Sequence, residues 1–181
     1  KVVNMSGGIK AWDNKTAFGS EGTGMLLFSG KEQVDEILIV AYSLEAGLQD
    51  FYTSMLDRVE NVQVKELFSK LSEIERKHQD RIFVEYQKVK GDQESREEFE
   101  RTAIAKAMEG GLTTEEYLGL YRTDFEVFEE VVSLAMGIEA QALDLYQRAA
   151  ENVPQEETYR TLLRIAEEER EHLKQLGKLL D

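Results

Sequence analysis

The fold is decided by two short stretches of sequence, Glu75-Arg76-Lys77-His78 and Glu169-Arg170-Glu171-His172, which hold the only two histidines of the chain. In each stretch the glutamate precedes the histidine by three positions, so both side chains face the same side of a helix. A further glutamate, Glu45 or Glu139, lies 30 residues before each stretch. Four carboxylates and two imidazoles in this order predict the ligands of a two-metal site inside a four-helix bundle.

The two halves of the chain also repeat one another around these residues, at an offset of 94 positions. The segment 41–52 aligns with 135–146, and the segment 71–78 aligns with 165–172. A period this long with only two copies indicates a duplicated helix pair rather than a solenoid.

The composition bounds the class of protein. With 181 residues, 41% hydrophobic and 32% charged, the chain fits one globular domain of full size. No apolar run reaches the roughly 18 residues of a membrane span, and the start does not resemble a secretory signal. Cysteine is absent, which excludes disulfides, thiolate zinc sites and iron–sulfur clusters. We therefore expect a cytoplasmic protein with no membrane partner.

The net charge of −14 disfavours some partners and favours others. Phosphate backbones would be repelled, so we expect no nucleic-acid partner. Divalent cations would be attracted, although most of this charge is interpreted as solvated helix surface.

The pattern along the chain predicts an all-α protein. We expect a non-helical N-terminal segment over 1–30 and a four-helix bundle over 31–181. Ser29 and Glu32 suggest a capping box for a first helix over about 31–59. Asn61 would cap the second helix, which ends at Gly91. The third and fourth helices are expected over about 123–151 and from Pro154 to the C-terminus.

The segment between the second and third helices predicts a long helical crossover. Ser95 and Glu98 suggest a capping box for a middle helix that Gly110 and Gly111 would end. A short helix should then begin at Thr113. This connection is long enough to span the length of the bundle.

Each of the six candidate ligands occupies a position that the helical period assigns to the core. Four buried, ionised carboxylates are very unfavourable without cations, so they are either protonated or bound to metal. Two divalent cations would neutralise them, and carboxylate with imidazole suits iron or manganese, with zinc as a further option. Glu75 and Glu169 are the expected bridging ligands, and Glu45 and Glu139 the expected terminal ones.

Plainer interpretations exist for each residue taken alone. A single Glu-x-x-His motif is usually a surface coincidence, and a single glutamate in an apolar stripe is more often a helix-edge residue. The matched pairs favour metal. Tyr52 and Tyr146 would bond a ligand carboxylate, act as a radical relay, or fill the core with their hydroxyl groups bonded. Four other polar residues are duplicated as well. They could orient the histidines, but we expect them to form ion pairs at the surface or between helices: Asp50, Asp144, Arg76 and Arg170.

With these residues in hand, the segment 31–181 resembles the ferritin-like di-iron superfamily, and within it the rubrerythrin-related branch. The resemblance implies a bundle that binds two iron ions through Glu45, Glu75, His78, Glu139, Glu169 and His172. It also implies a reaction with dioxygen or hydrogen peroxide. Typical rubrerythrins carry another glutamate where this chain has Ala142, and a four-cysteine iron site that this chain cannot form.

The first 18 residues resemble something different. The segment Val2 to Trp12 is similar to the last strand and turn of a rhodanese-like domain. Because the chain begins with Lys1 rather than methionine, we expect a fragment of a rhodanese–ferritin-like fusion. A rhodanese needs a cysteine nucleophile, so this chain cannot carry out sulfur transfer itself.

These observations predict a di-iron carboxylate oxidoreductase, of the rubrerythrin-like peroxidase or ferroxidase type. The expected partners are dioxygen or hydrogen peroxide, an external electron donor, the upstream rhodanese domain and a second copy of the chain in a homodimer. The alternatives are a non-catalytic bundle that binds or stores metal and a dimerisation module for the rhodanese.

The duplication further predicts a pseudo-two-fold axis between the two metal positions. A seventh ligand would break this symmetry, and neither Ala142 nor its counterpart Leu48 can supply one. We expect these two apolar side chains to border the open face of the site.

Overall fold

The computed structural model describes residues 28, 30–91, 95–103, 118 and 123–180. Within these ranges the chain is helical without strands, which confirms the predicted all-α class. The helices are α2 (Val34–Met55), α3 (Val62–Lys90), α4 (Arg96–Thr102), α6 (Phe128–Asn152) and α7 (Glu156–Gly177). The predicted rhodanese-like stretch lies outside the described residues. None of the helices examined in these ranges is both long enough and apolar enough to cross a bilayer.

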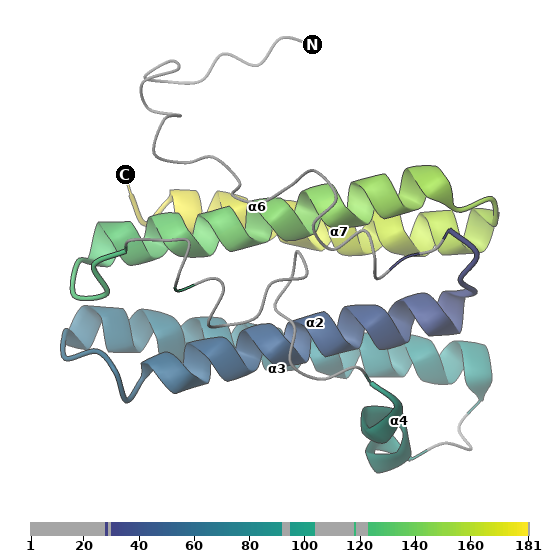
Figure 1. Cartoon of the computed structure of the whole chain (residues 1–181), viewed down its shortest axis with the longest axis horizontal. Helices are drawn as coiled ribbons and strands as arrows, with labels where there is room; N and C mark the ends of the chain where they lie inside the picture. The colour runs from purple at the N-terminus through teal and green to yellow at the C-terminus, as the bar shows by residue number, and fades with distance from the viewer. Residues whose placement is uncertain (1–27, 29, 92–94, 104–117, 119–122, 181) are drawn as a thin grey trace, which may run out of the picture.

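The four long helices form a bundle of two antiparallel pairs (Figure 1). Helix α2 packs along α3, and α6 packs along α7, while contacts of α2 with α7 and of α3 with α6 join the pairs. The short helix α4 lies beside the α2–α3 pair (Figure 1). The predicted four-helix bundle is therefore confirmed.

Helix α2 begins later than the sequence predicts, and Ser29 of the predicted capping box lies outside the described residues. The carboxylate of Glu32 accepts from the backbone N–H groups of Gly30 (2.9 Å) and Lys31 (3.1 Å), in the turn before the helix. Glu36 instead accepts from the N–H of Gln33 at 2.9 Å. The helix consequently begins at Val34, three residues later than predicted, and it ends at Met55 rather than near residue 59.

The start of α6 also differs from the prediction, and Glu126 contacts a different part of the chain. Its carboxylate accepts from the N–H groups of Glu60 (2.8 Å) and Asn61 (2.7 Å) in the turn between α2 and α3. Helix α6 begins after Glu126, at Phe128. The predicted cap at Asn61 is confirmed, since its side chain accepts from the N–H of Gln63 at 2.9 Å.

The remaining boundaries are close to the predicted ones with two exceptions. Helix α7 begins at Glu156, two residues after Pro154, but it ends at Gly177 instead of continuing to the C-terminus. Helix α4 has the predicted cap at Ser95, but it ends at Thr102, because the backbone of Ala103 is extended. The predicted helix end at Gly110–Gly111 and the short helix from Thr113 lie outside the described residues.

The buried apolar side chains form two separate clusters along the bundle. The first core cluster includes Leu38, Leu44, Ile82, Leu145 and Leu162. The second core cluster includes Leu48, Phe51, Phe68, Val132 and Ile138. Between them lies a polar layer, defined here as Glu45, Glu75, His78, Glu139, Glu169 and His172. Every long helix contributes to both clusters and to the polar layer.

Helix α4 is held to the bundle by aromatic packing. Phe99 is fully buried and meets Tyr42 edge to face, with ring centroids 4.8 Å apart. Its ring also lies 4.4 Å from that of Tyr86 and 5.3 Å from that of Phe83. Such pairs stabilise beyond the area that they bury, so Phe99 is the main apolar anchor of this part of the crossover.

We therefore predict that Phe99→Ala lowers the free energy of unfolding by about 3 kcal/mol, through lost burial and the cavity it leaves. Urea unfolding of the metal-free protein measures this. Val84→Ala is the matched control, because Val84 is exposed and its change should stay within about 0.5 kcal/mol. Equal losses in both variants would contradict the anchoring role of Phe99.

Candidate metal centre

The structure brings all six predicted ligand residues into one layer, with one glutamate on α2, one on α6, and a Glu-x-x-His pair on each of α3 and α7. Nδ1 of His78 lies 3.2 Å from Oε2 of Glu45 and 2.9 Å from Oε2 of Glu75. In the other half, Nδ1 of His172 lies 3.2 Å from both Glu139 and Glu169. Each imidazole therefore faces the two carboxylates of its own helix pair.

The two halves meet through the histidines. The rings of His78 and His172 stack with centroids 4.3 Å apart and planes 6° from parallel. The imidazole–carboxylate contacts match on either side, as the duplication predicts, but the close groups of donor atoms differ, because His78 belongs to both groups and Glu139 to neither.

The donor groups of this layer fit metal ions. The ligand atoms of Glu45, Glu75 and His78 all lie within 4.8 Å of one another, as do those of His78, Glu169 and His172. All four carboxylates are buried, and so many buried anions call for compensating positive charge. Iron or manganese matches these oxygen and nitrogen donors. The assignment of the six residues as metal ligands remains a prediction.

In the metal-free layer the positive charge that is present comes from protons. Burial raises the pKa of Glu169 to about 8 against the lowering effect of its bond with His172, and the nearby Glu139 raises it further. Burial alone would lower the pKa of His172, but hydrogen bonds to Glu139 and Glu169 raise it to about 10. Burial, reinforced by the charge of His172, lowers the pKa of His78 to about 2. Of the two stacked imidazoles, only that of His172 is therefore a cation at neutral pH.

One buried polar neighbour of the candidate ligands is not indicated by the ligand motif. Gln79 is buried, and its Nε2 donates to Oε1 of Gln49 at 2.8 Å and to the backbone carbonyl of Glu45 at 3.4 Å. The signal was a break in the repeat, since the counterparts of Gln49 and Gln79 are Leu143 and Leu173.

The other duplicated polar residues lie away from the donor atoms. Arg76 pairs with Asp80 at 3.1 Å, Arg170 pairs with Glu167, and Asp144 pairs with Arg148 at 2.6 Å. All are pairs within one helix near the surface, as the sequence indicated. Tyr52 and Tyr146 are fully buried, one in each core cluster.

The prediction that Leu48 and Ala142 border one open face is wrong. Both side chains are fully buried. Leu48 belongs to the second core cluster and Ala142 to the first. Because α2 and α6 pass through the polar layer in opposite directions, residues three positions after Glu45 and Glu139 lie on opposite sides of it.

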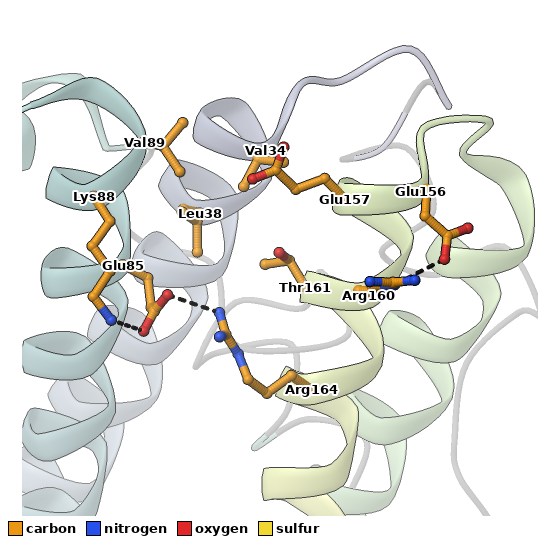
Figure 2. A pocket seen from close by; sticks show the side chains of 10 residues that line it. All are labelled: Val34, Leu38, Glu85, Lys88, Val89, Glu156, Glu157, Arg160, Thr161 and Arg164. Atoms are coloured by element: carbon orange, nitrogen blue, oxygen red, sulfur yellow. Dashed lines mark hydrogen bonds and ion pairs between the residues drawn. The ribbon is translucent and has the colours of Figure 1, made fainter.

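A cleft of about 920 Å³ lies between α7 and the α2–α3 pair, near the end of the bundle (Figure 2). Its cations are paired: Glu85 lies 2.7 Å from Lys88 and 3.2 Å from Arg164, and Arg160 lies 2.8 Å from Glu156. None of the six candidate ligands lines it, so this cleft is separate from the polar layer.

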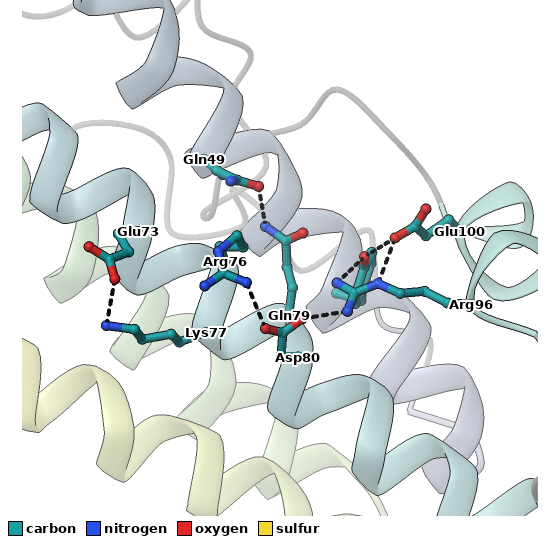
Figure 3. A network of polar contacts seen from close by, with 9 residues as sticks. Gln49, Glu73, Arg76, Lys77, Gln79, Asp80, Arg96 and Glu100 are labelled. Atoms are coloured by element: carbon teal, nitrogen blue, oxygen red, sulfur yellow. Dashed lines mark hydrogen bonds and ion pairs between the residues drawn. The ribbon is translucent and has the colours of Figure 1, made fainter.

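Next to the polar layer, a network of polar contacts connects α4 to α2 and α3 (Figure 3). The guanidinium of Arg96 pairs with Asp80 on α3 and with Glu100 at 2.9 Å, and it donates to the hydroxyl of Tyr42 on α2 at 3.2 Å. That hydroxyl donates to Glu100 at 2.6 Å. Burial and the bond to Glu100 raise the pKa of Tyr42 to about 12, so this hydroxyl remains a hydrogen-bond donor at neutral pH.

Comparison with known proteins agrees with this geometry. The family model described as Rubrerythrin matches residues 36–180. No curated protein and no solved structure gives a significant match. The matched span includes all six candidate ligands and most of the chain, and the chain therefore belongs to the rubrerythrin family, which consists in general of di-iron carboxylate proteins.

We predict that the affinity of the metal-free protein for Mn²⁺ rises with pH between about 6 and 9, since metal ligands must lose their protons. The raised pKa values of Glu169 and His172 mean that protons compete with the ion throughout this range. Titration calorimetry in buffers of different ionisation enthalpy should detect protons released on binding. An affinity independent of pH would contradict the protonated metal-free layer.

We also predict opposite effects of Glu75→Gln in the two states of the protein. Without metal the variant should unfold at higher denaturant concentration than the wild type, because a buried carboxylate is replaced by a neutral amide. With Mn²⁺ at 100 times its dissociation constant, the wild type should gain about 2.7 kcal/mol per site, and the variant should gain much less. Glu73→Gln is the control, because Glu73 lies on the same helix but is exposed and pairs with Lys77. If Glu75→Gln gained as much from Mn²⁺ as Glu73→Gln, Glu75 would not be a ligand.

Proposed function

From membership of the rubrerythrin family, we propose that this chain is a di-iron oxidoreductase that reacts with hydrogen peroxide or dioxygen. The observation that carries the proposal is the buried polar layer, with four carboxylates and two stacked imidazoles between two apolar clusters. Glu45, Glu75 and His78 would hold one ion, and Glu139, Glu169 and His172 the other. Two ferrous ions held by these residues would supply the two electrons that the reduction of peroxide, with two protons, to two molecules of water requires.

The protein's own residues contribute enclosure and charge. The two core clusters keep bulk water away from both ends of the layer, which strengthens electrostatic interactions inside it. The four carboxylates balance the charge of the ions and favour their oxidised state. Small oxidants need only a narrow path, and His172 is the most exposed member of the layer, with 11% of its side chain accessible against 3% for His78.

Turnover requires two electrons from an external donor, because this chain has no cysteine to hold an iron–sulfur site of its own. The net charge of −14 would suit a donor with a basic surface. We further propose that the protein is cytoplasmic, that it acts as a homodimer, and that the segment 1–30 connects it to an upstream rhodanese-like domain.

The experiment is to load the metal-free protein with two ferrous ions under anaerobic conditions and to mix it with peroxide or oxygen. We predict rapid growth of ferric absorbance in the near ultraviolet and consumption of one peroxide for every two ferrous ions. Glu169→Gln should lose most of this reaction. Glu171→Gln, two residues along the same helix, should keep it, because Glu171 is exposed and pairs with Lys174 at 2.8 Å.

The outcome separates this proposal from its alternatives. Oxidation no faster than that of ferrous ion in buffer, despite stoichiometric binding, would favour a non-catalytic metal-binding bundle. Storage in a mineral core would require a shell of many subunits, which sedimentation would reveal. A dimerisation module would dimerise regardless of Glu169→Gln and bind no metal.

A further inference from the structure

We propose that the two metal positions are unequal, and that the position formed by Glu45, Glu75 and His78 holds its ion more tightly than the one formed by Glu139, Glu169 and His172. Gln79 and Arg96 would cause this difference as positioning residues for the first position. The inference rests on the proposed function only in requiring that the layer bind two ions.

The ligands themselves do not distinguish the positions. The imidazole–carboxylate distances are 3.2 and 2.9 Å in the first half and 3.2 Å for both contacts in the second. The four carboxylates are buried to the same extent. Any inequality must therefore come from what surrounds and supports the ligands.

The two positions differ first in the hydrogen bonds that connect the helices carrying their ligands. In the first half, Gln79 bonds both Gln49 and the carbonyl of Glu45, which ties the helix of His78 to the helix of Glu45 directly beside their ligands. The residues at the same places in the second half are Leu143 and Leu173, which have no polar group to make such a bond. Polar partners outside the ligand set commonly change metal affinity about 10- to 100-fold.

The two positions also differ in the polar contacts about one helical turn from the ligands. Arg96 bonds Tyr42, three residues before Glu45, and Asp80, two residues after His78 (Figure 3). The guanidinium also lies 5.8 Å from the centre of the Tyr42 ring and 5.7 Å from that of Phe83. The counterparts of Tyr42 and Asp80 are Met136 and Lys174. A methionine cannot hold an arginine by hydrogen bonding, and a lysine would repel it.

Access to water differs in the same direction. The side chain of His78 is 3% exposed and that of His172 is 11% exposed. An ion leaves a site through exchange of its ligands for water, so the position that includes His172 should lose its ion first.

Release of zinc to a chromophoric chelator tests the proposal on the intact chain, without reference to any redox activity. The wild type should release two ions in two phases, with rates that differ by about tenfold or more. His172→Gln should keep only the slow phase, and His78→Gln only the fast one. The double variant Gln49→Leu/Gln79→Leu, which gives the first half the residues of the second, should bring the slow rate close to the fast one.

Arg96→Met should accelerate the slow phase alone, and circular dichroism would confirm folding in each variant. If Arg96→Met does not fold, the leucine pair still decides the question, because the second half has leucine at both corresponding positions. Gln175→Leu and Arg160→Met are matched surface controls and should leave both phases unchanged.

Two ions released at one rate by the wild type would overturn the inequality and leave the proposed function intact. A slow phase unchanged in the leucine pair variant would overturn the role of Gln79. Failure of the wild type to bind two ions under any condition would overturn both proposals.

Discussion

The mutual repulsion of four buried carboxylates is the constraint on which the rest of this structure depends. Glu45, Glu75, Glu139 and Glu169 come from four different helices and meet in one layer between apolar clusters. No globular core would keep them there without positive charge. Protons on the histidine pair and on Glu169 supply part of that charge in the metal-free protein, and two metal ions would supply all of it. Stability and function are therefore coupled through the same few side chains.

The bundle meets this constraint by dividing its core. The first and second core clusters lie on either side of the polar layer, and each contains residues from all four long helices. Each cluster can hold the helices together even where the layer between them contributes repulsion. Substitutions in the clusters are expected to change stability. Replacing a carboxylate of the layer by an uncharged side chain is expected to weaken metal binding and to stabilise the metal-free fold.

The duplication gives the layer its symmetry, and later sequence divergence removes that symmetry from its surroundings. The ligands match residue for residue, but the neighbours at Tyr42, Gln49, Gln79 and Asp80 do not. Helix α4 belongs to this difference, because Arg96 and Phe99 bind only the first helix pair in the part of the chain that the structure describes. Within one fold, equal ligands can thus have unequal neighbours, a difference that the ligand motif alone does not reveal.

The sequence by itself determined the helical class, the pairing of the helices and the six candidate ligands. These features depend on local spacing: apolar periodicity, a three-residue separation of glutamate and histidine, and a repeat offset that is visible without coordinates. Helix ends were less predictable, because Glu126 bonds the turn between α2 and α3 and α2 begins only after Glu32. Only the tertiary structure decided that the histidines stack and that Leu48 and Ala142 lie on opposite sides of the layer. It also decided that Arg96 connects α4 to α2 and α3. These facts depend on the directions in which distant segments cross, and no local pattern encodes such directions.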